Sequence, residues 1–361
     1  MSKISRIGMD TSKQIVQLHG VDEAERVVLR RKLRRKEVLP FFSGLAPTVV
    51  GIEACGGAHY WARELTLLGH AVRLMAPQYV KPYVKRGKND AADAEALCAR
   101  RSAPALVVGA WSQARMSRPT MRFVPVKSAK AQAALMLAGL RDRLVRRRTQ
   151  LANAIRGYAA EFGRVAARGQ AKIEPLLRRL QADEALPVLA RELFAEPARE
   201  YAELKARLQA VDARLMAWHR AHALSRRLAR IPGIGPVTAS LLAMKAPDPQ
   251  AFRSGRQFAA WIGLTPKDHS TAGKVRLGVI TRAGDETLRS LLVVGATAVI
   301  WQARRGKGSP PPWLVTLLGR KPPKLAAVAL ANKIARIAWK LMTTGEAYDA
   351  RRAMAAAPAA A

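Results

Sequence analysis

The sequence predicts an α/β domain with a mixed sheet, followed by an all-α region that comprises a long helical middle and a mostly helical C-terminal domain. Three observations support this class. Short β-prone runs alternate with helical segments in the N-terminal third, two heptad patterns occupy the centre, and helices divided by Gly- and Pro-rich turns fill the remainder. The expected boundaries are residues 1–125, 126–224 and 225–345, with a disordered Ala- and Pro-rich tail at 346–361.

Five β-prone runs and two helical segments define the N-terminal domain. Polar turns divide the first three runs, which predicts an antiparallel meander. The fourth run is apolar up to its terminal Glu53, as expected of a strand that is covered on both faces. The expected strands lie at residues 4–10, 15–18, 26–29, 48–53 and 71–75, and the expected helices at 37–43 and 59–68.

Four acidic residues of this domain are candidate metal ligands. Asp10 and Glu53 each end a predicted strand, and a carboxylate at the end of a buried strand requires a partner or a metal ion. Asp90 and Asp93 lie three residues apart on a predicted Ala-rich helix, so both carboxylates share one face. Helix capping for this pair and a turn role for Asp10 are the structural alternatives. The residues before this helix are basic and would face a phosphate backbone: Lys85, Arg86 and Lys88.

The charge of the chain identifies its class of partner. The protein has 62 Lys and Arg residues against 26 Asp and Glu residues, which gives a net charge of +36. Such self-repulsion favours a polyanionic partner, and nucleic acid is the leading candidate. The sequence contains no apolar run of about 18 residues that would predict a membrane span. Two cysteines, Cys55 and Cys98, provide neither a disulfide framework nor a zinc set, so we expect a cytoplasmic protein.

Two long amphipathic helices are expected in the middle of the chain, at residues 128–162 and 197–222. Their heptad seams predict either an antiparallel helical hairpin within one chain or a coiled coil between chains. Three consecutive basic residues on the first helix are candidate contacts to RNA or DNA: Arg146, Arg147 and Arg148. The seam residues are Leu137, Leu140, Leu144, Leu151, Ile155, Tyr158 and Phe162 on the first helix, and Tyr201, Leu204, Leu208, Val211, Leu215 and Trp218 on the second.

A Gly- and Pro-rich turn at residues 231–236 opens the C-terminal domain. It resembles a helix-hairpin-helix element, in which the backbone around Gly233 and Gly235 would contact a phosphate. A tight turn between two packed helices explains the same residues equally well. Further on, a helix ends at Gly263, a polar loop follows, and another helix runs from about residue 285 to 301.

Three N-terminal motifs resemble the ribonuclease-H-like, RuvC-type domain of the DEDD transposases that bacterial insertion sequences encode. The resemblance implies that Asp10, Glu53, Asp90 and Asp93 bind Mg²⁺ at the DNA-processing site, where metal ions would polarise the scissile phosphate. The motifs lie at residues 7–13 (Ile-Gly-Met-Asp-Thr-Ser-Lys), 51–57 (Gly-Ile-Glu-Ala-Cys-Gly-Gly) and 88–94 (Lys-Asn-Asp-Ala-Ala-Asp-Ala).

Residues 258–274 resemble the C-terminal domain of the same transposases, which implies a serine nucleophile at Ser270, with Thr271 as the alternative. An activated hydroxyl at this position would attack a DNA phosphate. The sequence Asp268-His269-Ser270 also contains the residue types of a hydrolase triad, but adjacent side chains cannot stack into that geometry. Basic residues that would stabilise charge on the phosphate follow: Lys274, Arg276 and Arg282.

The resemblance predicts a transposase that cuts and rejoins DNA through a serine nucleophile with the help of a Mg²⁺ site. It also implies a structured guide RNA, the bridge RNA, and a homodimer or homotetramer in which one protomer completes the serine site of another. Two alternatives stay open. A RuvC-like junction endonuclease would hydrolyse DNA without a covalent intermediate, and a non-catalytic nucleic-acid-binding protein would use its charge alone.

Overall fold

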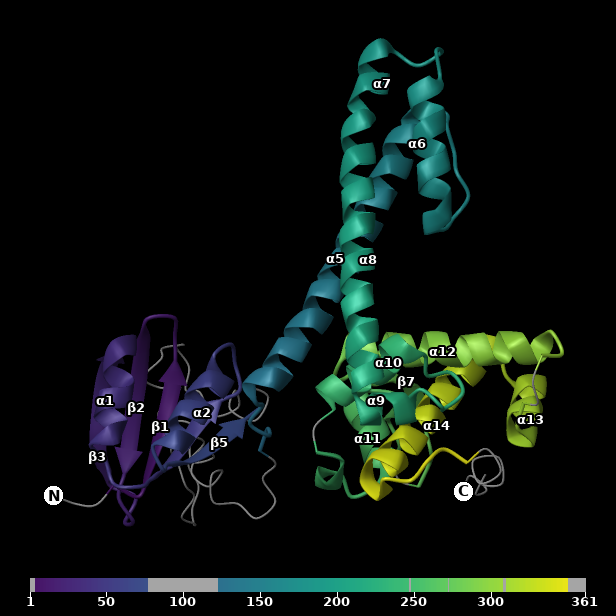
Figure 1. The fold of residues 1–361 in the computed structure, drawn as a ribbon. Helices are drawn as coiled ribbons and strands as arrows, with labels where there is room; N and C mark the ends of the chain where they lie inside the picture. The colour runs from purple at the N-terminus through teal and green to yellow at the C-terminus, as the bar shows by residue number, and fades with distance from the viewer. Residues whose placement is uncertain (1–3, 77–122, 247, 272, 308–309, 350–361) are drawn as a thin grey trace. The chain divides into compact units, whose positions relative to one another are not determined.

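The computed structural model describes residues 4–76, 123–246, 248–271, 273–307 and 310–349 (Figure 1). The chain separates into two compact units, Met1–Gln132 and Ala133–Ala361. Some of the features predicted from sequence lie outside the described residues. They are the acids Asp90 and Asp93 with their helix, the basic residues Lys85, Arg86 and Lys88, and the tail from residue 350 onward.

A five-stranded mixed sheet forms the first unit, with the strand order β3-β2-β1-β4-β5. The first three strands make the predicted antiparallel meander, while β4 is parallel to both β1 and β5. All five predicted strands are confirmed. Their bounds are β1 (Arg6–Thr11), β2 (Ile15–Val21), β3 (Val27–Arg34), β4 (Val49–Glu53) and β5 (Ala71–Met75).

The core of this unit lies on one face of the sheet. Ile7 and Met9 of β1 pair in register with Val50 and Ile52 of β4, and all four side chains are fully buried. The helix between β4 and β5 is a crossover connection, as the parallel pairing of these strands requires. Both predicted helices are confirmed and pack on this core: α1 (Val38–Ser43) through Phe42, and α2 (Ala58–Leu67) through Trp61 and Leu65.

Four helices form an arm in the second unit (Figure 1). The large side chains of the predicted α8 seam from Tyr201 to Leu215 are buried against residues of the same chain. Arg141 of α5 also forms an ion pair with Asp212 of α8, with Nε 2.6 Å from Oδ1. The helices of the arm are α5 (Ala129–Glu161), α6 (Ile173–Ala182), α7 (Val188–Leu193) and α8 (Ala195–Ala221).

The predicted seam of α5 is partly wrong. Leu144 and Ile155 are buried as expected, but Leu140, Tyr158 and Phe162 are exposed. The buried stripe passes instead through alanines: Ala134, Ala138, Ala152 and Ala159. In a helix so rich in alanine the large residues alone do not define the buried face, because alanine occurs on both faces of the helix.

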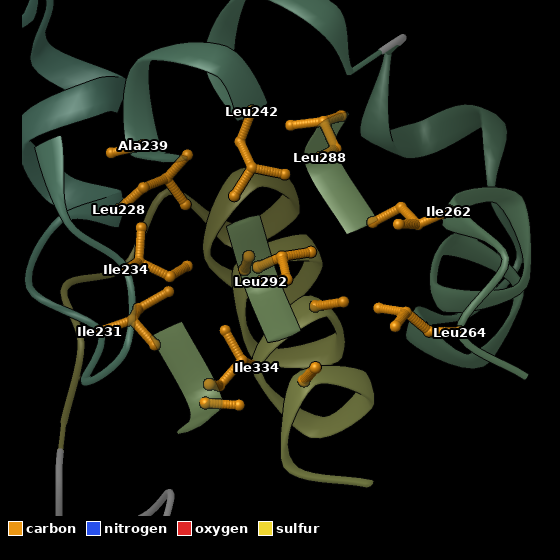
Figure 2. Packing of buried hydrophobic residues seen from close by; sticks show 14 of the residues in the cluster. Leu228, Ile231, Ile234, Ala239, Leu242, Ile262, Leu264, Leu288, Leu292 and Ile334 are labelled. Atoms are coloured by element: carbon orange, nitrogen blue, oxygen red, sulfur yellow. The ribbon is translucent and has the colours of Figure 1, made fainter. Parts of the chain in front are cut away.

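A helical bundle forms the rest of this unit, with α12 and α14 packed together at its centre (Figure 2). Leu292 of α12 and Ile334 of α14 lie among side chains from the preceding helices and turns, including Ile231, Ile234 and Leu264. The helices are α9 (Ala223–Leu228), α10 (Pro236–Lys245), α11 (Gly255–Ile262), α12 (Glu286–Arg304), α13 (Pro312–Arg320) and α14 (Pro323–Thr344).

Two parts of the bundle differ from expectation. The segment expected as a polar loop after Gly263 contains a two-stranded antiparallel hairpin of β6 (Pro266–Asp268) and β7 (Leu277–Ile280). The helix α13 was not predicted, because glycine- and proline-rich residues flank it. Among the helices described, none is both long and apolar enough to cross a membrane.

Candidate functional site

Asp10 and Glu53 lie side by side at the ends of two central strands. The parallel pairing of β1 and β4 aligns Met9 with Ile52, so Asp10 and Glu53 follow at the same level. Neighbouring strands are about 4.8 Å apart, and side chains alternate between faces along a strand. The two acids therefore share the face opposite the buried Met9 and Ile52, and both are half-buried.

This pair suits a hard divalent cation, because carboxylate oxygens are the ligands that Mg²⁺ prefers. The structure brings together these two of the four predicted acids; Asp90 and Asp93 lie outside the described residues. Within the described ranges, no group of three or more His, Cys, Asp or Glu side chains is placed to hold a metal ion.

A cationic cluster in the first unit was not anticipated from sequence. Nδ1 of His59 accepts a hydrogen bond from the Lys127 N–H at 3.2 Å, and Nε2 of the ring lies 3.4 Å from Lys127 Nζ. Arg63 donates to the Lys127 carbonyl at 2.8 Å. Burial lowers the pKa of His59 and of Lys127, and the Lys127 charge further lowers that of His59. His59 and Arg63 lie more than sixty residues before Lys127 in the sequence, so no local spacing pattern indicates this cluster.

Ser270 lies between the strands of the exposed hairpin in the second unit. The ladder continues beyond β6 and β7, because His269 N–H donates to the Arg276 carbonyl at 2.9 Å. Thr271 and Lys274 then exchange two backbone hydrogen bonds and close a tight turn. The hairpin geometry therefore holds the Ser270 backbone and leaves its side chain open to solvent.

The Ser270 side chain is oriented by two neighbours. Its Oγ accepts a hydrogen bond from the Arg276 N–H at 3.0 Å. Ser270 N–H donates to Asp268 Oδ1 at 2.8 Å, and hydrogen bonding to Ser270 is the largest cause that lowers the pKa of Asp268. Asp268 thus stays ionised near neutral pH beside the hydroxyl.

Sequence reasoning did not anticipate the contact between Asp268 and Ser270, and it disfavoured a triad at these positions. A Cβ placed on Gly278 would lie 3.1 Å from Nε2 of His269, so the imidazole packs over β7. The contact between Asp268 and Ser270 is the short-range turn that an aspartate forms with the residue two positions later. An Asp-x-Ser pattern before a tight turn was the available signal.

The base of the hairpin is rigid because backbone segments meet there without intervening side chains. Gly263 has φ +81°, and a Cβ on it would lie 2.2 Å from the Ala283 carbonyl oxygen. A Cβ on Gly284 would similarly lie 2.0 Å from the Trp261 carbonyl oxygen. Arg289 of α12 donates to the carbonyls of Ile262 and Ala283, which connects the segments that enter and leave the hairpin.

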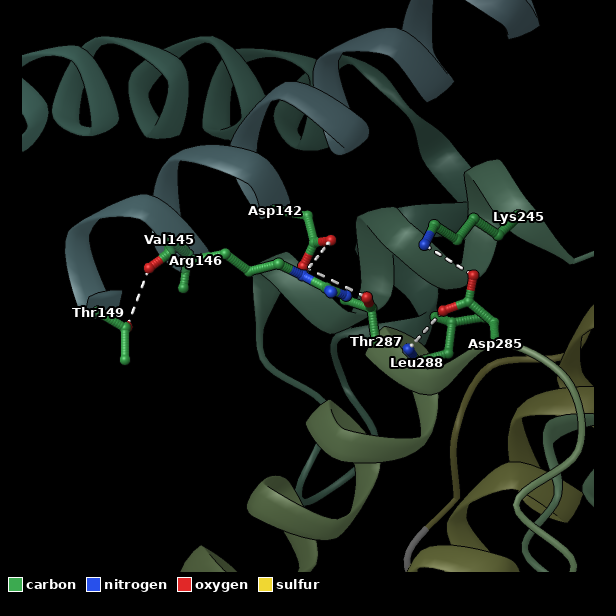
Figure 3. A network of polar contacts seen from close by, with 8 residues as sticks. All are labelled: Asp142, Val145, Arg146, Thr149, Lys245, Asp285, Thr287 and Leu288. Atoms are coloured by element: carbon green, nitrogen blue, oxygen red, sulfur yellow. Dashed lines mark hydrogen bonds and ion pairs between the residues drawn. The ribbon is translucent and has the colours of Figure 1, made fainter. Parts of the chain in front are cut away.

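Asp285 fixes the start of α12 directly after the hairpin (Figure 3). Its Oδ1 accepts from the Leu288 N–H at 2.9 Å, which caps the helix, and its Oδ2 pairs with Lys245 of α10 at 2.8 Å. Two residues later, Thr287 donates to Asp142 of α5 at 3.4 Å. Polar contacts to two helices therefore complement the backbone packing that orients the hairpin.

The three cations expected near Ser270 lie on the hairpin and its base. Lys274 belongs to the tight turn and Arg276 supplies the N–H that Ser270 accepts, and both side chains are exposed. Arg282 is also exposed and has φ +56°, an unusual backbone conformation for a residue other than glycine.

The Gly-rich turn has a packing function at one glycine. Gly233 has φ +87°, and a Cβ on Gly295 of α12 would lie only 1.8 Å from the Gly233 carbonyl oxygen. The backbone of Gly233 therefore contacts α12 directly, which favours the interpretation of this glycine as part of a tight turn between packed helices. Gly235 differs, since it is exposed and precedes α10, whose first turn has no side-chain cap.

The three basic residues on α5 have different surroundings. Arg146 pairs with Asp142 at 3.1 Å, and Arg147 lies 3.3 Å from Glu200 of α8, and both remain largely exposed. Arg148 is half-buried and faces the seam, where its charge acts on Tyr201. The exposed pair is therefore the part of this set that a nucleic acid would reach.

Comparison with known proteins identifies the class. Residues 225–308, which include the Ser270 hairpin, match the Transposase IS116/IS110/IS902 family. The chain is 62% identical over 349 residues to a putative transposase y4pF/y4sB of Sinorhizobium fredii, covering 96% of this chain and 86% of that protein. It is 48% identical to a probable family 20 transposase of Pseudomonas aeruginosa, with 96% and 98% covered. It is also 35% identical to the transposase for insertion sequence element IS1328 of Yersinia enterocolitica, with 97% and 100% covered.

These findings place the chain among the transposases. It belongs to the IS116/IS110/IS902 family and is a transposase of an insertion sequence.

Proposed function

We propose that this transposase recombines DNA through a covalent phosphoserine formed at Ser270. The Oγ of Ser270 attacks a DNA phosphorus atom, the bond from phosphorus to the leaving deoxyribose oxygen breaks, and that oxygen takes up a proton. The hydroxyl proton passes to a base, and the Asp268 carboxylate, which the Ser270 N–H holds at 2.8 Å, is the nearest candidate acceptor on the hairpin. The observation that carries this proposal is an exposed serine whose hydroxyl accepts from the Arg276 N–H and whose backbone N–H donates to Asp268, on a hairpin with a tightly packed base.

Three cations would assist this step. Lys274 and Arg276 flank the serine in the hairpin, and Arg282 lies at its base. Each guanidinium or ammonium group could neutralise charge that develops on the phosphate oxygens in the transition state.

We further propose that Asp10, Glu53, Asp90 and Asp93 form a Mg²⁺ site. The placement of Asp10 and Glu53 directly after the paired residues Met9 and Ile52 of β1 and β4 supports the first half of this set. A magnesium ion bound there would act as a Lewis acid toward a phosphate oxygen.

The net charge of +36 supports nucleic acid as substrate and partner. Described surfaces that could contact it include the exposed pair on α5 and the first turn of α10 behind Gly235. The basic residues Lys85, Arg86 and Lys88, which lie outside the described residues, are further candidates from the sequence. We propose that one of the bound strands is a structured guide RNA, and that the protein acts as a dimer or tetramer.

A strand-exchange assay tests this function. Purified protein, RNA from the element's flank, Mg²⁺ and labelled donor and target DNA would be combined, and recombinant product quantified. We expect Ser270→Ala and Asp10→Asn each to reduce the product at least a hundredfold while leaving DNA binding unchanged.

Thr271→Ala is the matched variant, because Thr271 is adjacent, exposed and the alternative nucleophile. We expect it to keep wild-type activity, and loss of product in Thr271→Ala with retention in Ser270→Ala would assign the nucleophile to Thr271. Retained cleavage by Ser270→Ala together with loss in Asp10→Asn would identify a hydrolytic nuclease instead. Full strand exchange by both variants would contradict the proposed site. A wild-type protein that binds DNA and yields no cleaved or exchanged product would leave only charge-based nucleic-acid binding.

A further inference from the structure

A cavity of about 500 Å³ opens in the second unit between the start of α11, one face of α14 and the C-terminal segment that follows it. None of the hairpin residues 264–285 lines this cavity. It is therefore separate from the serine site, although both belong to the same helical bundle. Its volume lies within the range of about 300–1,000 Å³ that small-molecule and cofactor sites occupy.

Four cationic side chains line the cavity. Arg256 projects from α11, and Lys333, Arg336 and Lys340 come from two successive turns of α14. Burial is the main cause that lowers the pKa of Lys333, and the neighbouring Arg336 charge lowers it further. An anionic ligand would relieve this repulsion.

Two carboxylates, from Glu346 and Asp349, lie in the same wall and leave the cations in excess. In a site for phosphate alone these carboxylates would repel the ligand. Carboxylates do accept hydrogen bonds from the exocyclic amino group of a nucleobase. The mixed wall therefore fits a ligand that joins a phosphate to a base.

Two aromatic side chains, Trp339 and Tyr348, line the cavity. Trp339 is held by its indole N–H, which donates to the Pro249 carbonyl at 2.8 Å. A Cβ on Gly255 would lie 3.1 Å from the Trp339 ring, so the start of α11 packs directly on the indole. Tyr348 is half-buried and presents a second ring from the C-terminal segment.

We propose that this cavity binds one unpaired nucleotide of a nucleic-acid strand, with its phosphate on Arg336 and Lys340 and its base stacked on Tyr348. This inference rests on the proposed function, because it requires a protein that handles nucleic acid. Helix starts attract phosphates through their backbone N–H groups, so the first turn of α11 adds to the side-chain cations. Stacking on an aromatic ring accepts any base, and contact with single strands is its usual role.

Equilibrium binding by the full-length protein tests the proposal. The probes are single-stranded DNA and RNA oligonucleotides of one sequence and the corresponding DNA duplex. We expect Tyr348→Leu to weaken single-strand binding at least fivefold and duplex binding less than twofold, since stacking requires an unpaired base. Tyr348→Phe retains the ring and should keep wild-type affinity, which separates stacking from a general loss of structure.

Lys340→Gln should reduce the slope of log affinity against log salt by about 0.7 for single strands, the value for one lost phosphate contact. Lys324→Gln is the matched control, because Lys324 is exposed at the start of α14 and lies outside the cavity wall. Loss confined to the DNA or to the RNA oligonucleotide would identify which strand supplies the nucleotide.

If the wild-type protein binds single strands and both Tyr348→Leu and Lys340→Gln bind them as well as Lys324→Gln does, the cavity proposal is overturned. The proposed recombination would remain in place. A wild-type protein that binds neither strand nor duplex would overturn both.

Discussion

At the residue scale, the serine site consists of a few short contacts rather than a deep pocket. Ser270 is held by the Arg276 N–H and by Asp268, and all three lie on one exposed hairpin. Such openness fits a substrate as large as a DNA duplex, which itself would enclose the reacting groups. Asp268 is the residue whose function the structure adds to the sequence-based site.

We predict that Asp268→Asn slows strand exchange about a hundredfold, the lower end of typical contributions from proton transfer. The amide keeps an acceptor for the Ser270 N–H but removes the negative charge beside the hydroxyl. Single-turnover rates would measure the effect, and DNA affinity should stay at the wild-type value. An unchanged rate would show that Asp268 only shapes the turn.

At the element scale, glycine contacts determine how the turn and the helices of the bundle pack. The carbonyl oxygen of Gly233 lies where a Cβ on Gly295 would be, so α12 has no room for a side chain at this position. The hairpin base uses the same device at Gly263 and Gly284. Small residues therefore mark the packing contacts in this part of the chain.

Gly295→Ala should destabilise the protein by about 1–3 kcal/mol or more, because the added methyl overlaps a fixed backbone atom. Gly319→Ala is the control. Gly319 is an exposed helical glycine on α13 with open space around it, so alanine should stabilise the protein by about 0.5–1 kcal/mol. Denaturant unfolding of both variants measures the difference, and equal stabilities would contradict the packing described.

A buried hydroxyl network at the junction of α8, α9 and α10 provides a pH-dependent element. Nδ1 of His219 lies 2.8 Å from Ser225 Oγ, which lies 3.3 Å from Ser240 Oγ. Burial, followed by the Arg226 and Arg220 charges, lowers the pKa of His219 below its ordinary 6.5. Folding therefore favours the neutral ring.

The stability from this histidine is fully present above pH 6.5 and is lost as the pH falls through the lowered pKa of the folded protein. Thermal unfolding between pH 7.5 and 5 should show a falling Tm. His219→Asn, which keeps a hydrogen-bonding group near Nδ1, should flatten that dependence. A variant with the wild-type pH profile would exclude His219 as its source.

Elements with strong periodicity were predictable, and those that depend on tertiary contacts were not. The five strands followed from β-prone runs between turns, and the α8 seam from its large side chains. The hairpin was missed because every residue of β6 is exposed, so it carries no alternating pattern. The α5 face was misassigned because alanines on that face give no hydrophobic contrast.

The same limit applies to the site. The positions of Asp10 and Glu53 followed from strand ends, because parallel neighbours bring their carboxyl ends together. The Asp268 contact and the cluster of His59, Arg63 and Lys127 arise from a turn and from chain packing, which no spacing rule encodes.

At the scale of the whole molecule, the excess positive charge is the dominant property. The carboxylates of the chain are too few to neutralise this charge, since basic residues outnumber acidic ones by 62 to 26. We predict that affinity for duplex DNA falls at least tenfold between 50 and 200 mM salt, as counterion release requires for several phosphate contacts. Titrations at four salt concentrations would measure the slope, and a flat response would exclude charge as the source of binding.

Trapping of a protein–DNA adduct tests the central claim most directly. Labelled donor and target DNA would be incubated with protein, guide RNA and Mg²⁺, denatured, digested and analysed by mass spectrometry. We predict a nucleotide attached through phosphate to Ser270, absent in Ser270→Ala and present in Thr271→Ala. Cleaved DNA without any adduct, or an adduct on another residue, would contradict the account.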